Sequence, residues 1–152
     1  MSRWTSAPTN VADTSAASGA AGVTPSIAVL PLTTAGTNTR EASIALGITS
    51  ELTNAVSRVQ GMRVASQTAT AGLVGRSLTL GDIGNALGVR MVLEGSVQSV
   101  GKQLRVTVRL VDVRADSTLW VDRFDGPVDS TFAVQDAASR AVVSAVAARA
   151  VR

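Results

Sequence analysis

The clearest pattern in the sequence is an alternation of apolar and polar positions between residues 88 and 126. It covers residues 91–98, 104–111 and 118–124, and turn-forming segments separate the three runs. A period of two places one side of each run against a core and the other side in water. Gly, Asp and Ser at the two breaks favour tight turns. The pattern therefore predicts an antiparallel meander of three strands.

The strongest helical pattern covers residues 40–60, where apolar residues recur every three to four positions. Thr39 is the predicted N-terminal cap and Gly61 the predicted stop, with Glu41 on the solvent side. Gly47 lies inside this helix, and we expect close packing on the sheet to require a residue without a side chain there. The predicted core stripe is Ile44, Ile48, Leu52, Val56 and Val59.

The remaining segments complete an alternating order of strands and helices. Residues 26–32 form a continuous apolar run closed by a proline, which predicts a buried strand, and residues 62–66 predict a short second one. Shorter apolar periodicities predict helices over residues 79–87 and 131–149. The segment 67–77, between the predicted strand 62–66 and the predicted helix 79–87, is expected to be a loop with at most one helical turn.

Together these elements predict an α/β fold of the two-layer α+β kind, in the order β-α-β-α-β-β-β-α. It would hold a mixed sheet of about five strands, ending in the antiparallel meander, and three helices. We assign this domain to residues 26–152. Residues 1–25 are rich in Ser, Thr, Ala and Gly and show no periodicity, which predicts a polar tail without a core of its own.

Several surface features are candidate contacts for a partner. Trp4 is a lone aromatic side chain in the polar tail and could order the tail on a partner. Arg105 and Arg109 share one face of a predicted strand, although a solvated sheet face accounts for them better than a partner does. The last helix carries a second apolar line beyond the one that a sheet requires, which predicts a second contact surface or a homodimer. This line consists of Val143, Val146 and Ala150.

Composition argues against catalysis by this chain. It contains no His and no Cys, so the commonest general base and the thiolate ligands and nucleophiles are absent. Lys102 is the only lysine and falls in a predicted turn, where a solvated amine is a poor nucleophile. The acids near the end of the meander do not follow the spacing of a calcium loop, and Glu94 is expected to pair with Arg90 or Arg109. We therefore assign no catalytic residue, no metal site and no cofactor.

The charge and hydropathy of the chain limit its partners. The net charge is only +3, and the glycines match no phosphate-binding loop, so we expect no nucleic-acid binding. No stretch approaches the roughly 20 apolar residues that span a bilayer. The first 24 residues lack the apolar segment of a secretory signal. These features predict a cytoplasmic location, or a place on the cytoplasmic face of a membrane complex reached through the partner.

The meander and its flanking segments also resemble a known family. In order, the sequence carries SIAVLPL (26–32), LGITSELTNAVSRVQGMRV (46–64), IGNALGV (83–89), VLEGSV (92–97), LWVDRFD (119–125) and FAVQDAASRAVV (132–143). This succession resembles the TolB amino-terminal-like domain, which is related to the FlgO-type domain. The resemblance implies an α/β module that recurs in bacterial regulators beside cyclase, kinase or winged-helix domains, and it brings no catalytic residues.

Three functional hypotheses follow. The first is a non-enzymatic interaction module, an accessory or scaffolding subunit that docks on a larger protein assembly. The second is a small-ligand sensor of a bacterial signalling system, with an apolar pocket between the first helix and the meander. The third is an enzyme, which the missing His and Cys disfavour. The first hypothesis fits the sequence best.

Overall fold

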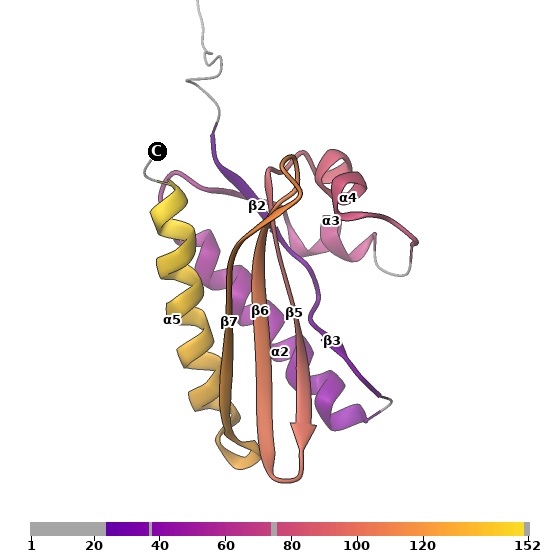
Figure 1. The fold of residues 1–152 in the computed structure, drawn as a ribbon, viewed down its shortest axis with the longest axis vertical. Helices are drawn as coiled ribbons and strands as arrows, with labels where there is room; N and C mark the ends of the chain where they lie inside the picture. Colours follow the sequence, from indigo (N-terminus) through magenta and orange to yellow (C-terminus); the bar gives the residue numbers. More distant parts are fainter. Residues whose placement is uncertain (1–23, 37, 74–75, 151–152) are drawn as a thin grey trace, which may run out of the picture.

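A computed structural model describes residues 24–36, 38–73 and 76–150 of the chain (Figure 1). In chain order its elements are β2 (Ser26–Val29), β3 (Thr33–Thr34), α2 (Thr39–Ser57), β4 (Arg63–Val64), α3 (Gln67–Ala71), α4 (Leu80–Leu87), β5 (Met91–Val100), β6 (Gln103–Asp112), β7 (Ser117–Pro127), the 3-10 turn η1 (Val128–Ser130) and α5 (Thr131–Ala150). The predicted two-layer class is confirmed. Within the described ranges the fold has one strand and one helix more than expected.

The sheet combines a parallel part and an antiparallel part. Its strands follow the order β4-β2-β5-β6-β7, and β3 also pairs with β5. β2 runs parallel to β4 and β5, whereas β5, β6 and β7 form the predicted antiparallel meander. Leu93 lies opposite Leu110 and Val97 opposite Val106, so the core residues of neighbouring strands share one face. The pairing of β6 with β7 shifts between Leu110 and Val111, as at a β-bulge.

Helices cover the two faces of this sheet unequally (Figure 1). On one face α2 and α5 pack over the meander and enclose the main core, and α5 also contacts α2. On the other face α4 covers only the parallel end, where its apolar residues pack on Ala28, Val89 and Val92. The largest fully buried side chains of the main core are Ile27, Ile48, Leu52, Leu93, Leu104 and Leu110.

The first predicted strand is interrupted. β2 ends at Val29, and the chain pairs with β5 again at β3, where Thr33 lies opposite Ser96. Pro31 lies in the break, because proline has no N–H to donate to a strand ladder. The sequence pattern predicts no strand at β3, since two threonines are too short a run to show a period of two.

The first helix differs from its prediction at both ends and in the middle. Asn38, not Thr39, is the N-cap, and its Oδ1 accepts the Arg40 N–H at 2.8 Å. The helix ends at Ser57, before Gly61, whose φ of 81° lies in the left-handed region. The expectation for Gly47 was wrong, because this glycine is exposed and a Cβ there would meet nothing within 4 Å.

The predicted second contact line on the last helix is also corrected. Val146 is fully buried in the main core, while Val143 and Ala150 are only partly buried. Helix α5 lies between two neighbours, the strands β6 and β7 on one side and α2 on another. Val146 is therefore used in the core and cannot contact a partner in the folded domain, while contacts by Val143 and Ala150 stay a prediction.

Candidate partner-binding surface

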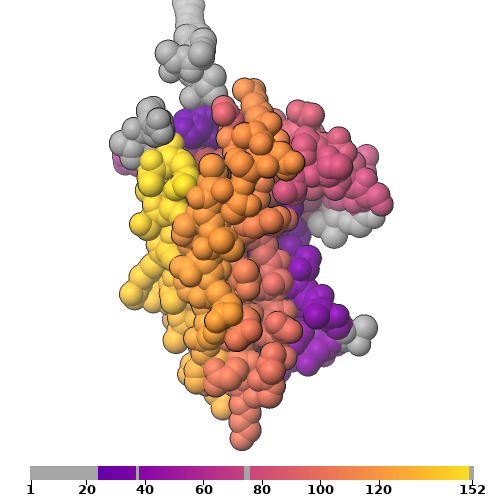
Figure 2. Space-filling model, in the orientation of Figure 1, coloured from indigo at the N-terminus to yellow at the C-terminus, as the bar shows by residue number. Residues whose placement is uncertain are grey.

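The meander presents a continuous polar face on the side opposite α2 and α5. Strand register aligns nine side chains in three rows across β5, β6 and β7, and we call them the outer meander face. The rows are Glu94–Arg109–Val121, Ser96–Thr107–Arg123 and Gln98–Arg105–Asp125. Six of the nine are exposed and three are half-buried. Figure 2 shows the strands of the meander over much of the visible surface, beside α5.

Two ion pairs cross the strands of this face, and a third lies within β7. Arg109 pairs with Glu94, as predicted, and Arg105 Nε lies 3.1 Å from Asp125 Oδ1. Arg123 Nε lies 3.4 Å from the second oxygen of the same Asp125 carboxylate. Half-exposed pairs of this kind stabilise a fold by about 0–1 kcal/mol. Their main effect is to hold three guanidinium groups in place beside two carboxylates, which leaves an excess positive charge.

The row Glu94–Arg109–Val121 of the outer meander face borders a shallow hollow, which we call the β3 hollow. Its volume is about 270 Å³, and it lies between the β2–β3 connection and the strands β5 to β7. Leu30, Pro31 and Val121 supply apolar lining, while Glu94 and Arg109 stand at its rim. Val121 is 56% exposed, so its side chain is accessible to another molecule. An apolar hollow rimmed by charge can accept an apolar side chain of another protein.

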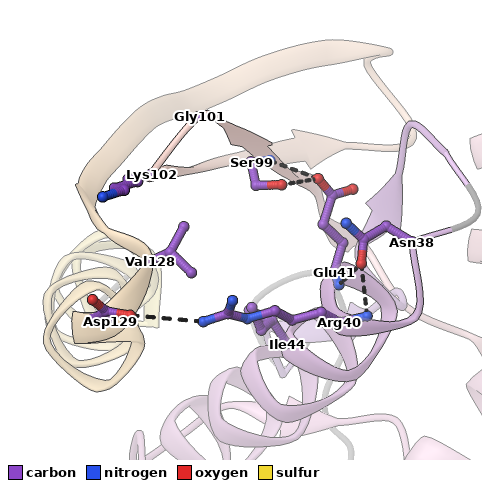
Figure 3. A pocket seen from close by; sticks show the side chains of 9 residues that line it. All are labelled: Asn38, Arg40, Glu41, Ile44, Ser99, Gly101, Lys102, Val128 and Asp129. Carbon is purple, nitrogen blue, oxygen red and sulfur yellow. Dashed lines mark hydrogen bonds and ion pairs between the residues drawn. The ribbon is translucent and has the colours of Figure 1, made fainter.

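A different hollow lies between the start of α2, the β5–β6 turn and η1 (Figure 3). Its volume is about 340 Å³, and Ile44 and Val128 are its only large apolar lining residues. The polar groups around it are largely engaged with one another. Arg40 Nη2 lies 3.9 Å from Asp129 Oδ1, and Asn38 is occupied as the helix cap. The small-ligand hypothesis predicted an apolar pocket at this location, and this polar lining does not favour it.

Glu41 has a structural role in this second hollow that the sequence did not predict. The helical pattern placed Glu41 on the solvent side, but the residue is only 8% exposed. Its carboxylate accepts hydrogen bonds from the Ser99 hydroxyl and, at 2.8 Å, from the Ser99 N–H. These bonds, the hydroxyl first, hold the pKa of Glu41 below its usual range, although burial opposes them. Glu41 thus caps the edge of β5 beyond the point where β3 ends.

The structure separates the partner contacts predicted from sequence. Arg105 and Arg109 both belong to the outer meander face, on the middle strand. Val143 and Ala150 are partly buried on α5, and Val146 belongs to the core. Trp4 lies outside the described residues, so its role stays a prediction. The sequence missed the β3 hollow, because its apolar lining comes from an irregular connection and an edge strand.

The described ranges contain no group of three or more acidic, His or Cys residues that could hold a metal ion. Lys102 is exposed in the β5–β6 turn, at the rim of the hollow beside Glu41. Across the same described ranges no helix has the length and apolar character needed to cross a bilayer.

One curated protein shares recognisable sequence similarity with this chain. No family model matches the sequence. Over 122 residues the chain is 33% identical to putative adenylate cyclase 3 of Rhizobium meliloti (strain 1021). That alignment covers 80% of this chain but 21% of the relative, so the chain spans about a fifth of that protein's length.

Solved structures share the fold at low identity. TolB from Acinetobacter baumannii superposes with a TM-score of 0.58 at 18% identity, over 82% of this chain and 28% of that one. Lipoprotein GNA1162 from Neisseria meningitidis superposes with a TM-score of 0.54 at 18% identity, over 67% of this chain and 79% of that one. The LpoB C-terminal domain from Salmonella enterica superposes with a TM-score of 0.50 at 16% identity, over 68% of this chain and 83% of that one. The fold is therefore TolB-like, which confirms that part of the resemblance, while the FlgO-type relationship stays a prediction.

Proposed function

We propose that this chain is a non-enzymatic interaction module, an accessory or scaffolding unit that docks a protein partner on the outer meander face. The observation that carries the proposal is the β3 hollow, an exposed apolar depression beside a ladder of arginines and carboxylates. The partner would place an apolar side chain in this hollow. Acidic groups of the partner would meet Arg105 and Arg109, whose half-exposed guanidinium groups keep free N–H donors.

The chemistry of the chain supports a non-enzymatic role. The sequence has no His, no Cys and a single lysine, which leaves few groups for proton transfer or nucleophilic attack. The cyclase named among the relatives is about five times longer than the matched segment. We propose that the shared segment is an accessory part of that protein as well. The cytoplasmic location expected from the sequence is part of the same proposal.

Site-specific photocrosslinking tests the docking surface. A benzophenone amino acid at Val121 should form a saturable crosslink to one partner protein in cells. The same group at Leu46, which is 67% exposed on α2, should not. Equal crosslinking from both positions, or none from Val121, would overturn the proposal.

Affinity measurements on the identified partner complete the test. The double variant Arg105→Gln, Arg109→Gln should weaken binding at least about tenfold, because hydrogen bonds to charged groups contribute roughly 1.5–3 kcal/mol each. Arg140→Gln is the matched control, since Arg140 is an exposed arginine on α5 paired with Asp136 at 2.7 Å. Unchanged affinity in the double variant, with circular dichroism showing an intact fold, would count against this face.

A further inference from the structure

Three arginines line another hollow, which shares no residue with the outer meander face or the β3 hollow. Arg63, Arg90 and Arg114 surround it near the start of β2, between α4 and the β6–β7 turn, and we call it the arginine hollow. Its volume is about 570 Å³. The three arginines come from β4, the segment before β5 and the β6–β7 turn, which are distant in sequence. The fold thus gathers positive charge at one place.

Specific contacts hold each arginine in position. Arg63 donates from Nη2 to the carbonyl of Gly88, the left-handed C-cap residue of α4. Arg90 Nε lies 3.4 Å from Asp112 Oδ1. The same Asp112 oxygen accepts the Arg114 N–H at 3.0 Å, which fixes the turn that carries Arg114. These contacts use one side-chain N–H of Arg63 and one of Arg90. A guanidinium offers five such donors, so most of them are left for a ligand.

The charges of the arginine hollow are not balanced within the chain. Among the described residues Asp112 is the only carboxylate that pairs with any of the three guanidinium groups. Burial raises the pKa of Asp112, but hydrogen bonds from the Ala115 N–H, the Arg90 side chain and the Arg114 N–H outweigh it, and the net pKa is lowered. Asp112 is therefore ionised at neutral pH and neutralises one of three positive charges. The remaining charge would be relieved by an anionic ligand.

The side of the arginine hollow that α4 forms is lined by Gly81, Gly84 and Gly88, together with Asn85. Val113 fills the space above Gly84, since a Cβ there would lie 2.6 Å from Val113 Cγ2. A Cβ at Gly81 would meet only the Thr79 hydroxyl of the same helix, at 3.7 Å, so the space above this glycine is open. Glycine allows another backbone to approach closely, and an asparagine amide can both donate to and accept from a peptide group.

We propose that the arginine hollow binds an extended acidic segment of a partner protein. Its Asp or Glu carboxylates would pair with Arg63, Arg90 and Arg114, and its backbone would pass over Gly81, where the space is open. The exposed arginines favour a protein segment over a small molecule, because small-ligand sites bury most of the ligand surface. This proposal rests on the proposed function, since it supplies the chemistry of a docked partner.

A peptide titration of the full chain tests this proposal. The probe is a fluorescein-labelled peptide of about eight residues in which glutamate and glycine alternate, and its glutamine counterpart is the control peptide. Only the acidic peptide should raise the fluorescence anisotropy, and added salt should weaken its binding. Arg114→Gln and Arg63→Gln should each reduce the affinity roughly tenfold, as expected for a lost charged hydrogen bond. Arg140→Gln should leave the affinity unchanged.

Amide NMR spectra locate the bound peptide. The signals of Gly81 and Gly88 should shift with a titration curve that matches the anisotropy. Shifts confined to the rows of Arg105 and Arg109, or no binding of the acidic peptide, would overturn the proposal. Binding of pyrophosphate without binding of the peptide would also overturn it, in favour of a small anion. If only this proposal fails, the crosslink from Val121 persists. If only the outer meander face fails, peptide binding persists without that crosslink.

Discussion

Replacing Gly84 with alanine tests how α4 and the β6–β7 turn are packed together. Gly84 is buried in α4, and a Cβ there would lie 2.6 Å from Val113 Cγ2 and 3.2 Å from the Val89 carbonyl oxygen. Carbon atoms in good contact are about 3.5–4.0 Å apart, so Val113 or its backbone must move. Val113 directly precedes Arg114, and the displacement would therefore also disturb the arginine hollow.

The expected size of the effect combines two opposing contributions. Overpacking of a filled site costs about 1–3 kcal/mol of unfolding free energy. Alanine in a helix interior recovers about 1 kcal/mol relative to glycine, so Gly84→Ala should destabilise by about 0–2 kcal/mol. Gly47→Ala provides the reference, since Gly47 lies in the interior of α2 with open space around it. That variant should gain about 0.5–1 kcal/mol, and the difference between the two isolates the contact with Val113.

Urea unfolding of Gly84→Ala, Gly47→Ala, Val113→Ala and the double variant Gly84→Ala, Val113→Ala measures these quantities. Removing the Val113 methyl groups makes room for the new Cβ, so residues 84 and 113 should show a coupling free energy of about 1–3 kcal/mol. Each kcal/mol corresponds to a shift in Tm of roughly 2–6 °C for a chain of this size. If Gly84→Ala stabilises as much as Gly47→Ala, or if the double variant is additive, the packing described for the turn is wrong.

Two further variants test the buried roles found for sequence-predicted surface residues. Glu41→Gln should destabilise the chain most at neutral pH, because the pKa of Glu41 is lower in the folded than in the unfolded state. In urea unfolding series, the difference in unfolding free energy from wild type should shrink below about pH 5. A difference that does not depend on pH would contradict this role. Val146→Ala should cost about 2–3 kcal/mol as a core substitution, against less for the half-buried Val143→Ala. A change in unfolding free energy within about 0.5 kcal/mol for Val146→Ala would mean that this residue is not part of the core.

The meander and the helices were predictable because each carries a strong periodicity of its own. The alternation over residues 91–98 and 104–111 corresponds to β5 and β6, and the stripe through Ile48, Leu52 and Val56 is the buried side of α2. β3 has only two residues, which is too short for any period to identify, whereas β4 lies within the short strand predicted over residues 62–66. Their pairing depends on the long strand or strand segment beside them.

The errors about single residues have different physical origins. Glu41 lies seven residues before Ile48, on the same side of the helix as the core stripe, so the periodicity itself places it inward and only its charge favoured the solvent side. The end of β5 brings Ser99 to its carboxylate. A helical pattern also does not show what another element places against a helix. Val146 was assigned to a surplus surface because the pattern could not show that α5 contacts α2 as well as the sheet. Gly47, in contrast, was expected to be packed and faces open space.

The unequal covering of the sheet separates the residues that stabilise the fold from those of the proposed binding face. The face under α2 and α5 holds the main core, so substitutions there act on folding. The outer meander face contributes exposed ion pairs, each worth about 0–1 kcal/mol to stability. A long row of charged residues on that face is therefore hard to explain as a folding device. Because glutamine variants of Arg105 and Arg109 should leave the fold intact, any loss that they cause in a cell would report on binding.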